Sequence, residues 1–139
     1  MLTEEIIGVK SDEKETDAAI EMTEGVEIPD EVRKEIVEKA TELKTQNKLR
    51  KVFVVIVEGE DGDDKPFYIA YFRRPNLVHF SQYMNFVQKD IVQANKMLAT
   101  NVFIAGDREL IDDDDLFLYG TMSQLTDIIK ARNAEMVKK

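Results

Sequence analysis

Two apolar segments of strand length constrain the fold of this chain most. Residues 52–57 read Val-Phe-Val-Val-Ile-Val, and residues 67–72 read Phe-Tyr-Ile-Ala-Tyr-Phe. Runs of β-branched and aromatic residues of this length are typical of strands. The intervening Glu58–Lys65 is rich in Gly and Asp, which form turns. We therefore predict strands over about 51–58 and 66–72, paired as an antiparallel hairpin that ends before Pro75.

The next segment has the most regular apolar periodicity in the chain. Its apolar residues are spaced alternately by three and four positions: Leu77, Phe80, Met84, Val87, Ile91, Ala94 and Leu98. This spacing predicts helix with one continuous apolar stripe, packed on the hairpin. A coiled-coil partner is the alternative occupant of such a stripe. Asp90 is a suitable N-cap, so one bent helix and two successive helices both fit.

Two further helices are expected at either side of this region. Pro29 and the acidic residues after it favour a helix start, and a narrow stripe follows at Val32, Ile36, Ala40 and Leu43. A last helix is expected from about Thr121, because Thr121 and Gln124 match a capping box. Leu125, Ile128, Ile129, Met136 and Val137 would share one face of that helix.

These elements predict an α+β fold in which an antiparallel β-hairpin, or small sheet, packs against three to four helices. The charge is uneven along the chain. Residues 1–28 hold 9 of its 28 acidic residues but only 2 of its 19 basic residues. We therefore predict two parts, an acidic flexible arm over 1–28 and a single α+β domain over 29–139.

Composition excludes several functional classes. A net charge of −9 disfavours binding to nucleic acid or to anionic membranes, because both need clustered Lys and Arg. The absence of cysteine excludes disulfides, thiol catalysis and Cys-ligated zinc. No apolar run approaches the length of a membrane span, and the first residues lack the apolar core of a signal peptide.

Few residues suggest chemistry. The only histidine, His79, has Gln82 and Tyr83 at the positions where a metal site would need ligands, so an ordinary helical histidine is favoured. The run Asp112, Asp113, Asp114 and Asp115 is a weak candidate for Ca²⁺ or Mg²⁺. A solvated acidic loop or a helix N-cap is the preferred interpretation. Arg73 and Arg74 suit an anion, but in an acidic protein they more often pair with carboxylates, for which the aspartate run is a candidate.

The order of the motifs over residues 48–139 supports a family resemblance. The hairpin ends in Arg73-Arg74-Pro75-Asn76, and the following helical stretch carries Asp90 near its middle. Asn101 precedes an apolar piece and Gly106-Asp107. The aspartate run precedes Leu116-Phe117-Leu118, and Ser123-Gln124-Leu125 opens a helix that ends in lysines. This arrangement resembles small acidic proteins of tailed bacteriophages and prophages, including those of Bacteroides-type hosts, some of which are similar to tail assembly chaperones.

The resemblance implies a non-enzymatic, cofactor-free role in virion assembly. Its partners would be other phage structural or assembly proteins, including a helical tape-measure protein, with self-association as an alternative. Such a protein would act in the host cytoplasm during assembly. The alternatives are a structural virion component (connector, completion or decoration protein) and an acidic inhibitor that mimics nucleic acid. The expected partner-binding residues are Phe80, Met84, Val87 and Ile91, with Arg73 and Arg74 beside them.

Overall fold

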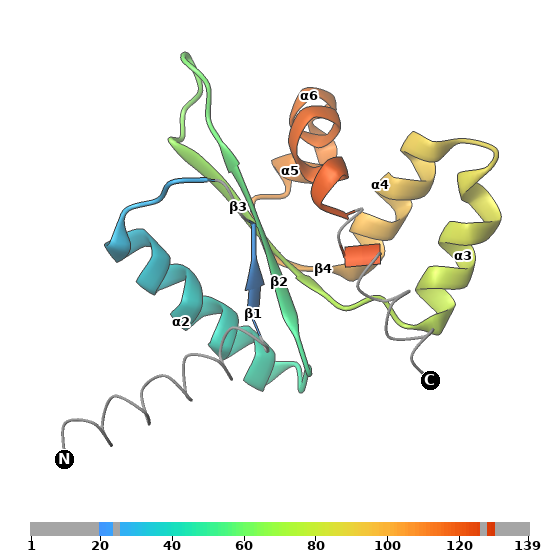
Figure 1. Ribbon diagram of the computed structural model, residues 1–139, viewed down its shortest axis with the longest axis horizontal. Helices are drawn as coiled ribbons and strands as arrows, with labels where there is room; N and C mark the ends of the chain where they lie inside the picture. Colours follow the sequence, from blue (N-terminus) through green and yellow to red (C-terminus); the bar gives the residue numbers. More distant parts are fainter. Residues whose placement is uncertain (1–19, 24–25, 126–127, 130–139) are drawn as a thin grey trace.

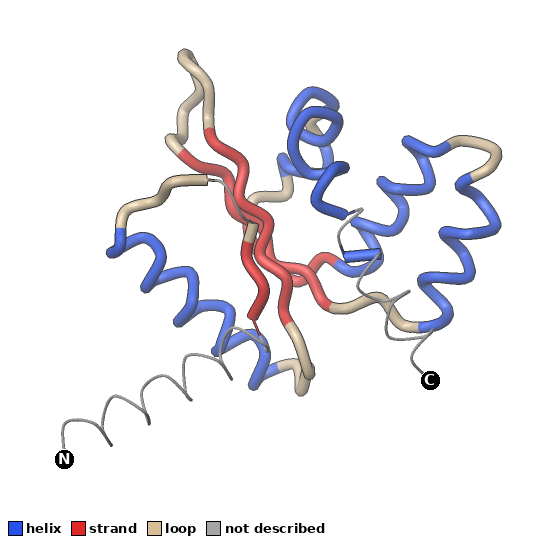
Figure 2. Tube along the Cα trace, viewed as in Figure 1, coloured by secondary structure: helices blue, strands red, loops and turns tan. Residues whose placement is uncertain are grey.

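The computed structural model describes residues 20–23, 26–125 and 128–129, and shows a sheet covered by helices on both faces (Figure 1). The elements follow in this order: β1 (Ile20–Met22), α2 (Asp30–Gln46), β2 (Val52–Glu58), β3 (Phe67–Arg73), α3 (Leu77–Val87), α4 (Ile91–Val102), β4 (Phe103–Gly106), α5 (Glu109–Asp112), α6 (Asp114–Leu116) and the π-helix η1 (Phe117–Thr121). Helix α2 covers one face of the sheet, and the later helices lie on the other (Figure 2). The predicted α+β class is confirmed.

The sheet is larger than the predicted hairpin. Strands β2 and β3 pair antiparallel from Val52 opposite Arg73 to Glu58 opposite Phe67, as expected. They form the centre of a four-stranded mixed sheet of order β1-β2-β3-β4. The first strand runs parallel to β2, and β4 runs antiparallel to β3. The hairpin prediction is therefore correct for the two central strands and incomplete for the sheet.

The predicted boundary between arm and domain was placed too late. Residues 20–22 form β1, and Ile20 is buried beside the core residues of α2 and β2. Val26 and Ile28 pack against the same cluster. A three-residue strand within an acidic segment has too little periodicity to be recognised, which explains the error. Residues 1–19, the rest of the predicted arm, lie outside the described residues.

The two central strands are buried on both faces. Val52, Val54 and Ile56 of β2 face α2, where they meet Ile36, Ala40 and Leu43. Phe53 and Val55 point to the opposite core, together with the alternating residues Tyr68, Ala70 and Phe72 of β3. A strand covered on both faces has no polar side, which is why residues 52–57 read as an unbroken apolar run. The stripe predicted for α2 is confirmed as the cover of one of the two cores.

A glycine and an aspartate fix the end of β4 against β3. Gly106 has φ +110°, and a Cβ there would lie 2.4 Å from the carbonyl oxygen of Ile69. The next residue, Asp107, exchanges hydrogen bonds with Ile69: its N–H donates to the Ile69 oxygen at 2.8 Å, and its Oδ2 accepts from the Ile69 nitrogen at 2.9 Å. Oδ1 of Asp107 also accepts from Nζ of Lys65 at 2.6 Å. These contacts attach the hairpin to the chain entering α5.

The last helical segment begins earlier than predicted. Asp113 is the N-cap of α6, and its side chain accepts from the nitrogen of Leu116 at 3.1 Å. Helical structure then continues through η1, so Thr121 is not a cap. The Thr121 side chain is fully buried, and its hydroxyl donates to the carbonyl oxygen of Leu110 at 2.7 Å. The predicted capping box is therefore wrong. Leu125, Ile128 and Ile129 are buried as expected, whereas Met136 and Val137 lie outside the described residues.

Candidate interaction surface

Helices α3 and α4 form a helical hairpin beside the sheet, and α3 is its outer helix (Figure 1). Both helices begin with a side-chain cap. Asn76 and His79 form a capping box: Oδ1 of Asn76 accepts from the His79 nitrogen at 2.8 Å, and Nδ1 of His79 accepts from the Asn76 nitrogen at 3.3 Å. Asp90 caps α4 by accepting from the nitrogen of Gln93 at 3.1 Å. Two successive helices thus form, which is one of the two arrangements that the sequence predicted.

The capping role explains the only histidine. Partial burial, and secondarily the nearby positive charge of Arg73, lower the pKa of His79 below its usual value of 6.5. A neutral ring leaves Nδ1 able to accept the hydrogen bond of the capping box. Within the described part of the chain, no group of three or more His, Asp or Glu side chains could hold a metal ion.

The structure divides the predicted apolar stripe into buried and exposed residues. Phe80 and Leu98 are buried in the core, and Val87 is half-buried. By contrast, Met84 and Ile91 are 48% and 54% exposed. The break between α3 and α4 turns the chain back on itself, so a stripe that is continuous in sequence does not form one seam. Of the four apolar residues predicted to bind a partner, Met84 and Ile91 are accessible and Phe80 belongs to the core.

Further apolar side chains are exposed on the same helical hairpin. We call this set the α3–α4 surface: Leu77, Val78, Met84, Phe86 and Ile91, each between 39% and 61% exposed. Residues 77–102 contain only three charged residues, Lys89, Asp90 and Lys96, where the chain average of 34% would give about nine. On α3, Leu77 and Met84 are seven positions apart and share one side of the helix, whereas Phe86, two positions after Met84, lies on another side. Exposed large apolar residues and depletion of charge are features of protein-binding surfaces.

Arg73 and Arg74 lie where β3 ends and α3 is about to begin, next to the α3–α4 surface. A cleft of about 250 Å³ adjoins this junction, with Arg74, Pro75 and Asn76 on one side and residues 48–51 on the other. Those four residues are Lys-Leu-Arg-Lys, so the cleft is lined by four cations. Sequence reasoning missed this cluster because its two sides are separated by more than twenty residues.

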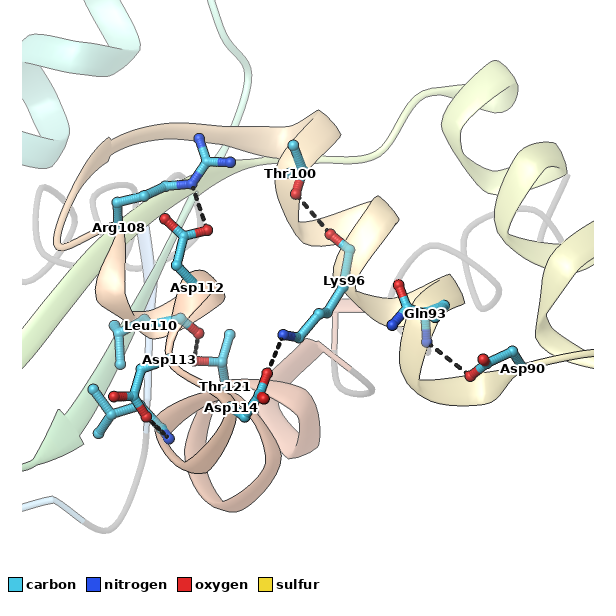
Figure 3. A network of polar contacts seen from close by, with 11 residues as sticks. Asp90, Gln93, Lys96, Thr100, Arg108, Leu110, Asp112, Asp113, Asp114 and Thr121 are labelled. Atoms are coloured by element: carbon cyan, nitrogen blue, oxygen red, sulfur yellow. Dashed lines mark hydrogen bonds and ion pairs between the residues drawn. The ribbon is translucent and has the colours of Figure 1, made fainter.

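Three residues of the aspartate run have structural roles (Figure 3). Asp113 is a helix cap, Oδ1 of Asp112 pairs with Nε of Arg108 at 3.4 Å, and Oδ1 of Asp114 accepts from Nζ of Lys96 at 2.6 Å. Lys96 comes from α4, so this ion pair joins the helical hairpin to α6. The ion pairs that the structure describes for this run are therefore with Arg108 and Lys96. The N-cap interpretation of the run is confirmed for Asp113.

Two other features were not predicted. Tyr119 and Leu118 of η1 are 87% and 42% exposed, beside a buried Gly120 that packs on Val57. A cavity of about 730 Å³ lies where β1 and β2 meet the helical segment after η1, and its polar lining includes Thr23, Ser123 and Gln124.

Comparison with protein-family models, with curated proteins and with solved structures finds no match. In the part of the chain that the structure describes, none of the helices combines the length and apolar character needed to cross a membrane.

Proposed function

We propose that this protein is a non-enzymatic binding protein of bacteriophage morphogenesis, acting as a tail assembly chaperone. The observation that carries the binding role is the α3–α4 surface, where large apolar side chains are exposed and charges are scarce. The assignment to phage assembly rests on the motif order over residues 48–139. The host cytoplasm during assembly is the proposed place of action.

The proposed occupant of the surface is an amphipathic helix of a long helical partner such as a tape-measure protein. A helical hairpin can receive a third helix along its length, with apolar anchors spaced by three or four residues. Met84, near the end of α3, and Ile91, at the start of α4, are the proposed anchors. Each leaves about half of its side chain to be covered by a partner.

The acidic-mimic alternative has less support from the arrangement of charge. A nucleic-acid mimic needs unpaired negative charge spread over a folded face. Here Asp112 and Asp114 are paired with cations, and Asp113 caps a helix. The alternative of a structural virion component shares the same binding surface, and it is separated from the chaperone role by the experiment below.

The test compares two double variants in cells that produce the phage. Met84→Ala with Ile91→Ala truncates the proposed anchors, and Leu118→Ala with Tyr119→Ala truncates exposed side chains on η1 as a matched control. Tagged proteins are captured and analysed by mass spectrometry, and purified particles from the same culture are analysed in parallel. Circular dichroism melting checks that both variants remain folded.

The proposal predicts that a long helical tail protein is captured by the wild type and the η1 control, and is lost from the Met84/Ile91 variant. This chain should then be absent from mature particles. Its presence in particles at a fixed copy number would instead identify a virion component. Capture that survives truncation of both anchors in a folded variant would refute the docking surface.

A further inference from the structure

The cleft beside the α3–α4 surface gathers positive charge in a protein whose net charge is −9. Its described lining is Lys48, Leu49, Arg50, Lys51, Arg74, Pro75 and Asn76, which includes four cations and no carboxylate. Like charges that lie at one cleft repel, and a bound anion would offset that repulsion for the cations that no described carboxylate pairs. We propose that this cleft binds a phosphate group of a small soluble ligand.

Two of the four cations are available for a ligand. Lys48 and Arg50 are exposed, and neither forms an ion pair with another described residue. Lys51 is partly neutralised, because its Nζ lies 3.8 Å from Oε2 of Glu21 and over the ring of Phe53. The proposed contacts are therefore made first by Lys48 and Arg50. Arginine suits a phosphate because its planar guanidinium can donate two parallel hydrogen bonds.

The backbone at Lys48 supports a role for its side chain. Lys48 follows the C-cap of α2 and has φ +54°, a left-handed conformation that glycine or asparagine usually occupies at this position. A non-glycine residue there carries strain. Glycine would relieve the strain and end the helix equally well, but it would remove the cation from the rim of the cleft.

The size of the cleft fits a small anion. A volume of about 250 Å³ corresponds to roughly eight water molecules at about 30 Å³ each, enough for a diphosphate with part of its hydration shell. A competing explanation is that Lys48 and Arg50 only complement the negative end of the α2 dipole. That explanation predicts loss of stability when they are neutralised, but no specific response to phosphate.

The experiment is calorimetric titration with inorganic pyrophosphate at constant ionic strength. The wild type is compared with Lys48→Gln/Arg50→Gln and with Lys34→Gln/Lys39→Gln, a control on the exposed side of α2. Each double variant removes two positive charges. Any general effect of net charge on anion binding is therefore the same in both. The proposal predicts saturable binding by the wild type and the control. Binding by the cleft variant should be weaker by about tenfold or more, as expected for loss of charge-assisted hydrogen bonds.

Two further measurements keep the test decisive. Lys48→Gly should raise the melting midpoint while weakening pyrophosphate binding, which separates ligand binding from folding. Amide shifts in NMR spectra should change at residues 48–51, 74, 76 and 77 on titration. No saturable binding by the wild type, equal weakening in both double variants, or citrate binding as tight as pyrophosphate would overturn the proposal. No partner protein is used, so the result is independent of the docking experiment.

Discussion

Replacing Gly106 by alanine should destabilise the fold by several kcal/mol, because two separate costs fall on this position. Gly106 has φ +110°, where a side chain is disfavoured by about 1–2 kcal/mol. A Cβ would also lie 2.4 Å from the Ile69 carbonyl oxygen and 2.8 Å from Cα of Ala70. Both atoms belong to the backbone of β3, which cannot rotate away as a flexible side chain would.

The steric cost follows from what must move. Gly106 pairs with Ala70 in the β3–β4 register, so relieving the overlap displaces β4 from β3 and strains the hydrogen bonds between Asp107 and Ile69. Overpacking of this kind typically costs about 1–3 kcal/mol. The two terms together give about 2–5 kcal/mol, a large fraction of the ~5–15 kcal/mol that holds a domain of ordinary stability.

Gly62 provides a matched control for the steric term. It also has positive φ, +96°, but a Cβ there would meet no atom within 4 Å. Gly62→Ala should therefore cost only about 1–2 kcal/mol, the backbone term. Urea unfolding followed by circular dichroism measures both free energies of unfolding, with unchanged m-values as a check of two-state behaviour. Equal losses in the two variants would show that β4 does not approach β3 as described.

Three other predictions follow from buried polar groups. Burial raises the pKa of Tyr71 to about 12, with smaller contributions from Asp107 and Glu35. The unfolded phenol loses its proton first, so the free energy of unfolding should fall as pH rises from 10 to 12. Tyr71→Phe should reduce this dependence in urea unfolding, and the raised pKa values of Tyr68 and Lys65 account for the part that remains. The pKa of His79 is lowered below 6.5, so the unfolded state binds more protons just below that pH. Stability should therefore decrease as pH falls through that window, and His79→Gln should flatten the profile measured by thermal melting. Asn95 is buried with Oδ1 unpaired among the described residues, so Asn95→Leu should leave stability unchanged or raise it by about 1 kcal/mol in urea unfolding, whereas Asn95→Asp should lower it.

The fold could be predicted where the pattern was local. The strands at 52–58 and 67–73 and the helix after Pro29 were recognisable because composition and turn residues agree over each segment. The first strand was not, since its three residues pair parallel to β2 and depend on contacts more than thirty positions away. The π-helix was also missed. The helical segment that contains it starts after the N-cap Asp113, eight positions before the predicted start at Thr121. Thr121 does not cap a helix, because its hydroxyl donates a buried hydrogen bond to the carbonyl oxygen of Leu110.

The candidate surfaces were predictable only in part, for a geometric reason. A heptad-like stripe predicts one face of one helix, but the turn at Gln88–Asp90 separates Phe80, which enters the core, from Ile91, which remains exposed. The basic cleft joins residues 48–51 to residues 74–76, and only the folded hairpin brings these segments together. Net charge was a poor guide here, because a chain that is acidic as a whole contains a local concentration of cations.

The distribution of charge also bears on how a partner could bind the α3–α4 surface. Covering a charged side chain requires its desolvation, which costs free energy unless the charge is paired. Of the three charged residues in the helical hairpin, Asp90 caps α4 and Lys96 is paired with Asp114, which leaves Lys89 at the turn. A helix lying along α3 would therefore cover apolar and neutral polar groups and desolvate few charges. Binding of that kind should depend weakly on salt, whereas pyrophosphate binding in the adjoining cleft should weaken as ionic strength rises. The two proposed surfaces share the β3–α3 junction, and their different salt dependence distinguishes binding at one from binding at the other.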